Sequence, residues 1–200
     1  MKTTANKLPR RIGIILFELL MVIVGVLIAF SLSNYENWKK EKQEQEKLLQ
    51  LCKQELKYNL SELYYGELIY DSLLTTFTTQ EQNLKQPRLE FRNISYIYDK
   101  GIWETAVAKG LFNGEIIGVI SDINSEINGL ALYCDRLHDF NTHLLLPNID
   151  QPIEEFYHTD NKRLKAKYEW YPNTLGIILS RFRQLNKASR KLQELIVEIE

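Results

Sequence analysis

Histidine is the side chain best suited to acid–base chemistry near neutral pH, and this chain has only three, His138, His143 and His158. The first two are five residues apart, whereas paired ligands in an H-E-x-x-H motif, which the sequence lacks, are four apart. The G-x-S-x-G, Walker and G-x-G-x-x-G motifs are absent as well. We therefore expect no metal site, no cofactor and no catalytic residues, and the chain is not predicted to be an enzyme.

Two clusters of polar residues could still carry a function. Glu154 and Glu155 precede His158 and could serve general acid–base catalysis, but their charged, proline-flanked stretch favours solvated side chains. The basic and aromatic stretch 162–171 could touch lipid headgroups or an acidic partner, with a plain surface loop as the favoured interpretation. The candidate partner contacts are Trp103, Glu104, Tyr168 and Trp170, although a tryptophan such as Trp103 on a short helix is more often a core residue.

Cys52 and Cys134 are the only cysteines, and two cysteines cannot complete a zinc site by themselves. Both lie on apolar helical stripes, which favours buried, unpaired thiols. A disulfide between them in an oxidising compartment is the alternative.

The segment 12–33 contains one charged residue, Glu18, and a helix needs roughly 20 apolar residues to cross a bilayer. Tyr35 and Trp38 follow, as interfacial aromatic residues do. The run is longer than the apolar region of a cleavable signal peptide, about 7–15 residues. We predict an uncleaved transmembrane helix, with a signal peptide cleaved after residue 33 as the alternative.

The tail 1–11 has four basic residues and no acid, which predicts a cytoplasmic N-terminus and an extracytoplasmic C-terminal domain. Within the span, Gly25, Ala29 and Ser33 recur every four residues, and Glu18 lies on nearly the same face. Such small side chains let two helices approach closely. The span is therefore predicted to pack against another envelope membrane protein or against a second copy.

The run Glu18-Leu-Leu-Met-Val-Ile-Val-Gly25-Val-Leu-Ile-Ala29-Phe resembles the span of an uncharacterised single-span membrane protein family of Bacteroidota. That family's span looks like E-I-x-x-V-x-I-G-I-L-I-A-L, followed by an N-x-W-like exit. Here Asn34 and Tyr35 occupy the exit, with Tyr35 in place of the usual Trp. The resemblance resumes weakly at residues 103–105 and 110–111 and in the helix ending near residue 133. It implies the topology and a Gram-negative envelope, and it supplies no activity.

The remaining sequence predicts an all-α domain. Residues 34–47 are almost wholly polar and read as a helical stalk, followed by a helical extracytoplasmic domain over 48–200. The first apolar pattern breaks at Thr75–Thr79, and any strand over 89–98 is short. The segment 145–173 is predicted to be a long loop, and the helix after it to be capped by Asn173 or Thr174. Three long helices and a short one predict an antiparallel bundle. Their expected ranges are about 36–78, 101–109, 114–144 and 174–199.

A net charge of −1 argues against a nucleic-acid-binding protein, which needs a basic face. We interpret the chain as a non-catalytic helical subunit of an envelope complex. This interpretation is favoured by the predicted anchor in the lipid bilayer, by the packing face in the span and by the lack of a catalytic motif. In this interpretation the chain lies in the bacterial inner membrane with its C-terminal domain in the periplasm. A sensory or ligand-binding ectodomain that signals through a partner transmembrane helix is the alternative.

Overall fold

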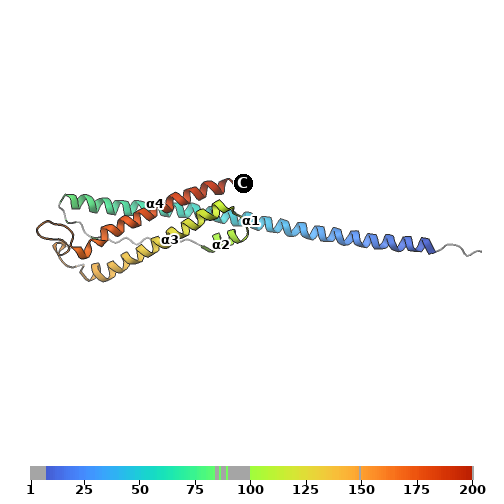
Figure 1. Cartoon of the computed structure of the whole chain (residues 1–200), viewed down its shortest axis with the longest axis horizontal. Coiled ribbons are helices and arrows are strands. Elements are labelled where there is room, and N and C mark those ends of the chain that lie inside the picture. Colours follow the sequence, from blue (N-terminus) through green and yellow to red (C-terminus); the bar gives the residue numbers. More distant parts are fainter. Residues whose placement is uncertain (1–7, 84–85, 87–88, 90–99, 149, 200) are drawn as a thin grey trace, which may run out of the picture. The chain divides into compact units, whose positions relative to one another are not determined.

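The computed structural model describes residues 8–83, 86, 89, 100–148 and 150–199 (Figure 1). Its α-helices are α1 (Leu8–Gln82), α2 (Lys100–Ala108), α3 (Gly114–Phe140) and α4 (Trp170–Val197). A π-helical turn (Asn141–Leu145) and three 3-10 turns (Leu146–Asn148, Ile153–Phe156 and Ala166–Tyr168) connect α3 to α4. Extended pairing among the described residues is limited to one isolated bridge, between Tyr157 and Leu164. The predicted all-α class, with three long helices and a short one, is confirmed.

The chain divides into two units, Met1–Leu48 and Leu49–Glu200, and α1 contributes to both. In the first unit the large apolar side chains from Ile15 to Leu32 are all exposed. By length and composition this part of α1 could cross a membrane. Tyr35 and Trp38 stack one turn beyond it, with ring centroids 6.1 Å apart.

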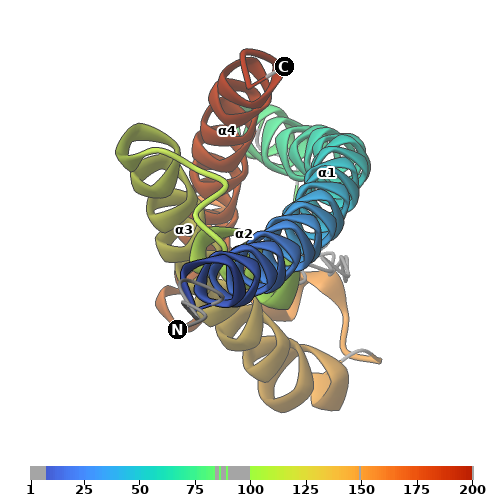
Figure 2. The ribbon, with the colours of Figure 1, turned by 90° about the vertical axis from the view of Figure 1, so that its right-hand side faces the viewer.

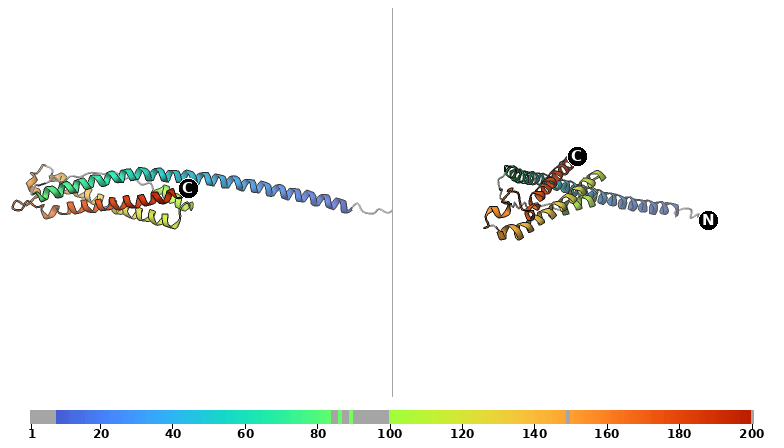
Figure 3. Two further views of the ribbon diagram at one scale, coloured as in Figure 1. Left: turned by 90° about the horizontal axis from the view of Figure 1, so that it is seen from above. Right: turned by 60° about the vertical axis from the view of Figure 1, so that its left-hand side comes forward.

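The second unit is a bundle of three long helices: the part of α1 from residue 49 onward, α3 and α4 (Figure 2). Helix α4 runs antiparallel to α1, because Phe77 contacts Tyr171 while Tyr70 contacts Phe182 (Figure 3). Buried positions on both helices alternate in steps of three and four, which is the spacing of a coiled-coil seam. On α1 they include Cys52, Leu56, Asn59, Leu63, Gly66, Tyr70 and Phe77, and on α4 Tyr171, Leu175, Ile178, Phe182, Leu185, Ser189, Leu192 and Ile196.

The boundaries of the two middle helices follow from local chemistry. Asn113 caps α3, since its side-chain oxygen accepts a hydrogen bond of 3.0 Å from the backbone N–H of Ile116. Gly110 follows α2 with a φ of +68°, which a glycine adopts at little cost, so the helix ends just before this residue. Helix α2 buries Trp103, whose ring stacks on Phe112.

The predictions for the ends of α1 and α4 were wrong. Helix α1 does not break at Thr75–Thr79 but continues to Gln82, because Phe77 is buried against Tyr171 of α4. Helix α4 begins at Trp170, before both expected caps, Asn173 and Thr174, and Thr174 is buried inside the helix. Proline is tolerated in a first helical turn, where its missing N–H has no intrahelical partner. The possible strand over 89–98 lies outside the described residues except for Leu89.

Candidate functional site

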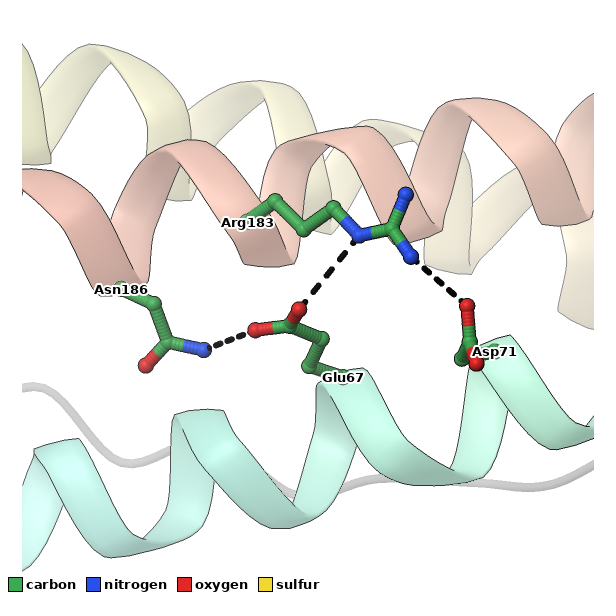
Figure 4. Close-up of polar contacts among 4 residues, drawn as sticks. All are labelled: Glu67, Asp71, Arg183 and Asn186. Atoms are coloured by element: carbon green, nitrogen blue, oxygen red, sulfur yellow. Dashed lines mark hydrogen bonds and ion pairs between the residues drawn. The ribbon is translucent and has the colours of Figure 1, made fainter.

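Polar contacts between α1 and α4 fix the rotation of α1 about its own axis (Figure 4). The Arg183 guanidinium spans two acids of α1, with Nη2 2.7 Å from Oδ1 of Asp71 and Nε 3.4 Å from Oε1 of Glu67. The amide of Asn186 donates a 2.6 Å hydrogen bond to the other oxygen of Glu67. Each exposed ion pair contributes little free energy, so the buried row of α1 decides which side faces the core, and the three directed contacts on one edge favour the same rotation.

A close approach at Gly66 fixes how far α1 stands from α4. A Cβ atom built on Gly66 would lie 2.5 Å from Cε1 of Phe182, so only a glycine leaves room for this ring. Phe182 is buried and also stacks on Tyr70, with ring centroids 5.6 Å apart. The polar edge and this aromatic layer together hold α1 rigidly, so its outward side chains form a preorganised surface.

The outward side of α1 carries a stripe of nine exposed, uncharged residues, which we call the α1 outer stripe. The two leucines and two tyrosines in it are 49–58% exposed. Successive members are three or four residues apart, as on the buried side. The stripe consists of Leu51, Gln54, Tyr58, Ser61, Tyr65, Leu68, Ser72, Thr75 and Thr79.

Isolated exposed leucines are ordinary on protein surfaces, but a regular uncharged row is not. Charged residues make up 26% of the chain, yet none falls within the α1 outer stripe. Tyr64, 59% exposed, adjoins the row. A helix face with apolar residues at this spacing suits docking of another helix.

A shallow groove of about 490 Å³ lies where α3, its π-helical turn and α4 meet. Arg136, His143 and Lys167 supply basic groups at its lining, and Asp139 is the acid among them. Trp170 forms an aromatic wall, held by the ring of Phe140 at a centroid distance of 5.3 Å. π-Helical turns occur often at functional sites, and this one carries His143. The groove suits an anionic group attached to a planar ring.

The four predicted partner contacts separate into two kinds. Trp103 and Tyr168 are only 1% and 2% exposed, so the expectation that they contact a partner is wrong. Trp103 fills the space under α2, and Tyr168 packs its ring on Phe156 at a centroid distance of 4.9 Å. Glu104 is exposed on α2, and Trp170 is half-buried in the groove lining.

In the first unit the predicted packing face is helical and open. Glu18, Ala29 and Ser33 are exposed on α1, and among the described residues no atom outside the adjoining helix backbone lies within 4 Å of a Cβ built on Gly25. A second helix could therefore approach this face closely. Contact with a partner at these four residues stays a prediction.

Both cysteines are free thiols, Cys52 buried as expected and Cys134 only half-buried, and the fold keeps them apart. Cys134 of α3 lies near Tyr70 of α1. Cys52 is also on α1, eighteen residues before Tyr70, so Cys52 and Tyr70 are about 27 Å apart at 1.5 Å per residue. A disulfide needs Cα atoms closer than about 7 Å. Burial raises the pKa of the Cys52 thiol to about 12 and that of Cys134 to about 11, so both stay protonated at neutral pH.

The polar residues considered for catalysis belong to the connection before α4. Glu155 pairs with Lys165 at 3.7 Å, and the same lysine donates a 2.7 Å hydrogen bond to the Glu155 carbonyl oxygen. The backbone N–H of His158 donates to the Arg163 carbonyl oxygen. Across the described part of the chain, no three His, Cys, Asp or Glu side chains gather as metal ligands.

Neither the α1 outer stripe nor the groove was found from the sequence. The stripe mixes Tyr with Ser, Thr and Gln, so it is hidden beside the stronger apolar row of the same helix. Its signal is the heptad recurrence of Leu51, Tyr58 and Tyr65. The groove is lined by residues about thirty positions apart in the chain, so no local sequence pattern predicts it.

Comparison of the chain with protein-family models, with curated proteins and with solved structures finds no match.

Proposed function

We propose that the chain is a membrane-anchored, non-catalytic interaction subunit of a protein complex in a bacterial envelope. The α1 outer stripe is the observation that carries this proposal, because it presents an ordered, uncharged helix face to an incoming helix. The apolar part of α1 is the anchor in the inner membrane. The basic residues of 1–11 favour a cytoplasmic N-terminus, which leaves residues 34–200 in the periplasm.

Photo-cross-linking in living cells tests the role of the stripe. A photoreactive phenylalanine analogue at Tyr58 or Tyr65 should give protein adducts after irradiation, since both side chains point outward. The matched control is Leu132 on α3, a leucine that is 49% exposed and lies outside the stripe. Adducts at the two tyrosines and none at Leu132 are expected. Equal labelling at all three positions would show that the stripe has no special affinity for protein.

The face around Gly25 is proposed to pack against the partner's span. Glu18 costs about 2.5–3.5 kcal/mol at the centre of a span on insertion scales and less near an interface, so a polar partner there stabilises the pair. Glu18→Leu and Gly25→Ile should each weaken co-purification of the complex while the protein still inserts. Glu18→Gln should be milder because an amide can hydrogen-bond across helices. If the complex co-purifies unchanged with both Glu18→Leu and Gly25→Ile, the span does not pack against a partner and serves only as an anchor.

The groove favours a second function, a ligand-binding ectodomain that senses a small anion. Arg136 and Lys167 would bind the anionic group and Trp170 would stack on the ring. A screen of aromatic carboxylates and phosphates by thermal shift tests this function, with Lys167→Ala as the variant that should lose the shift. A shift that persists in this variant would place binding elsewhere.

A further inference from the structure

We infer that the partner of the α1 outer stripe is a second copy of this chain, bound in parallel and in register. This inference rests on the proposed function, because it names the occupant of the same surface. Two copies anchored in one bilayer both carry Leu51, eighteen residues after Ser33, nearer to the anchor along the chain than Thr79. A parallel arrangement is therefore the one that anchored copies adopt.

The heptad register of the stripe aligns like with like. The first core position of each heptad is taken by Leu51, Tyr58, Tyr65, Ser72 and Thr79, and the other by Gln54, Ser61, Leu68 and Thr75. In a parallel pair each residue meets its own copy, so the tyrosines stack on tyrosines and the leucines pack on leucines. None of these layers brings two like charges together, since the stripe carries no charge.

The residues beside the stripe on one copy are complementary to those beside the stripe on a second copy. In a parallel coiled coil, the position before each first core residue faces a position five residues later on the other helix. Lys57 therefore faces Glu62 of the other copy, and this oppositely charged pair forms twice by symmetry. One heptad further on, Tyr64 faces Ile69 of the other copy, which is an apolar pair. A chain that pairs with itself needs this kind of flank, whereas a different partner would have no reason to match it.

The dimer should be weak unless the chains are anchored. The stripe runs from Leu51 to Thr79, about four heptads, but five of its nine positions are Gln, Ser or Thr, which add little to a coiled-coil core. Anchoring in one membrane raises the effective concentration of the copies, as linked binding modules do on the millimolar scale. Association is therefore expected in the membrane and is expected to fade when the protein is diluted in detergent.

Disulfide trapping of the full-length protein in native membranes tests the arrangement. Tyr58→Cys and Tyr65→Cys, made separately, should give covalent dimers under mild oxidation, because an in-register pair brings identical residues together. Leu132→Cys on α3 is the matched control and should stay monomeric, as should the unmodified chain, whose two thiols are buried or half-buried. Failure of both tyrosine variants to cross-link, or equal cross-linking by Leu132→Cys, would overturn the inference.

Charge exchange gives a second readout that misfolding cannot imitate. In the Tyr58→Cys background, Lys57→Glu and Glu62→Lys should each lower the dimer yield several-fold, since each places like charges across the interface. The double variant restores opposite charges and should recover the yield. No recovery in the double variant would count against the parallel register.

The two proposals can fail separately. If the photoreactive probes at Tyr58 and Tyr65 capture only a different protein while disulfide trapping yields no dimer, the stripe binds a partner and self-association is wrong. If neither method yields a product at these positions, both the self-association and the proposed role of the stripe are wrong. A disulfide dimer together with a photo-adduct of twice the chain mass supports both.

Discussion

Replacing Gly66 by alanine tests whether the α1–α4 contact is as tight as the structure describes. In an exposed helix interior this change stabilises by about 1 kcal/mol, because alanine is the better helix former. At Gly66 the new methyl carbon would lie 2.5 Å from Cε1 and 2.7 Å from Cζ of Phe182. The ring cannot swing aside freely, since it is buried and stacked on Tyr70. Overpacking in a core costs about 1–3 kcal/mol, and this confinement points to the upper end.

The net change in the free energy of unfolding is therefore a loss of about 2 kcal/mol, the overpacking cost less the helix gain. At about 2–4 °C per kcal/mol for a chain of this size, Tm should fall by about 4–8 °C. Thermal unfolding of the purified full-length protein, followed by circular dichroism, measures it. Gly118→Ala is the matched control: in the described part of the chain no atom beyond the adjoining helix backbone lies within 4 Å of a Cβ at Gly118, so this change should stabilise α3 by up to about 1 kcal/mol.

Shortening the facing side chain isolates the contact from other effects. Phe182→Leu should recover part of the loss caused by Gly66→Ala, so the double variant should be more stable than the two single changes predict by addition. A coupling energy of about 0.5–3 kcal/mol is typical of residues in direct contact. If Gly66→Ala stabilises the protein as Gly118→Ala does, the ring is not held where the structure places it, and the argument for a rigid α1 surface is refuted.

Three other perturbations follow from the structure. Cys52 and Cys134 should resist alkylation at pH 8 until the chain is unfolded. Burial raises the pKa of Cys52 from 9.0 to about 12. The stability that this protonated thiol confers is therefore present below pH 9 and is lost as the pH rises toward 12, which unfolding measured at graded pH would show. Arg183→Ala should lower the free energy of unfolding by about 0.5–1 kcal/mol at low salt and less at high salt, measured by urea titration; an unchanged midpoint at low salt would show that its ion pairs contribute nothing. A cysteine replacing Asn161 should react with an impermeant maleimide in spheroplasts and one replacing Thr3 should not, and the opposite pattern would reverse the proposed orientation.

The main elements of the fold could be predicted because each buried face is a regular row in the sequence. Ile116, Ile120 and Ile123 mark α3 by their spacing alone, and all three are buried. The end of α1 could not be predicted in this way, since its threonines favour extended backbone locally, while the contact of Phe77 with α4 favours the helix and joins residues far apart in the sequence. The start of α4 was missed because Pro172 looks like a helix breaker, although the first turn accepts it.

The candidate site was less accessible to sequence reasoning than the fold. An exposed tyrosine and a buried tyrosine look alike in a sequence, as Tyr65 and Tyr70 show. The same difficulty affected Trp103 and Tyr168, whose aromatic rings suggest a binding surface but fill the core. Only the contacts of α1 with α4 decide which of its two heptad rows faces outward, and those contacts join residues more than one hundred positions apart.

The antiparallel register of α1 and α4 restricts the insertions and deletions that the bundle tolerates. A single residue inserted between Gly66 and Tyr70 would turn every later side chain of α1 by about 100° and carry the buried row out to solvent. Seven inserted residues would restore the face but shift the row by about 10.5 Å along α4. The buried rows of α1 and α4 would match again only if seven residues were also inserted into α4, opposite the insertion in α1. Homologous bundles of other lengths are therefore expected to differ by whole heptads, gained or lost in both helices together.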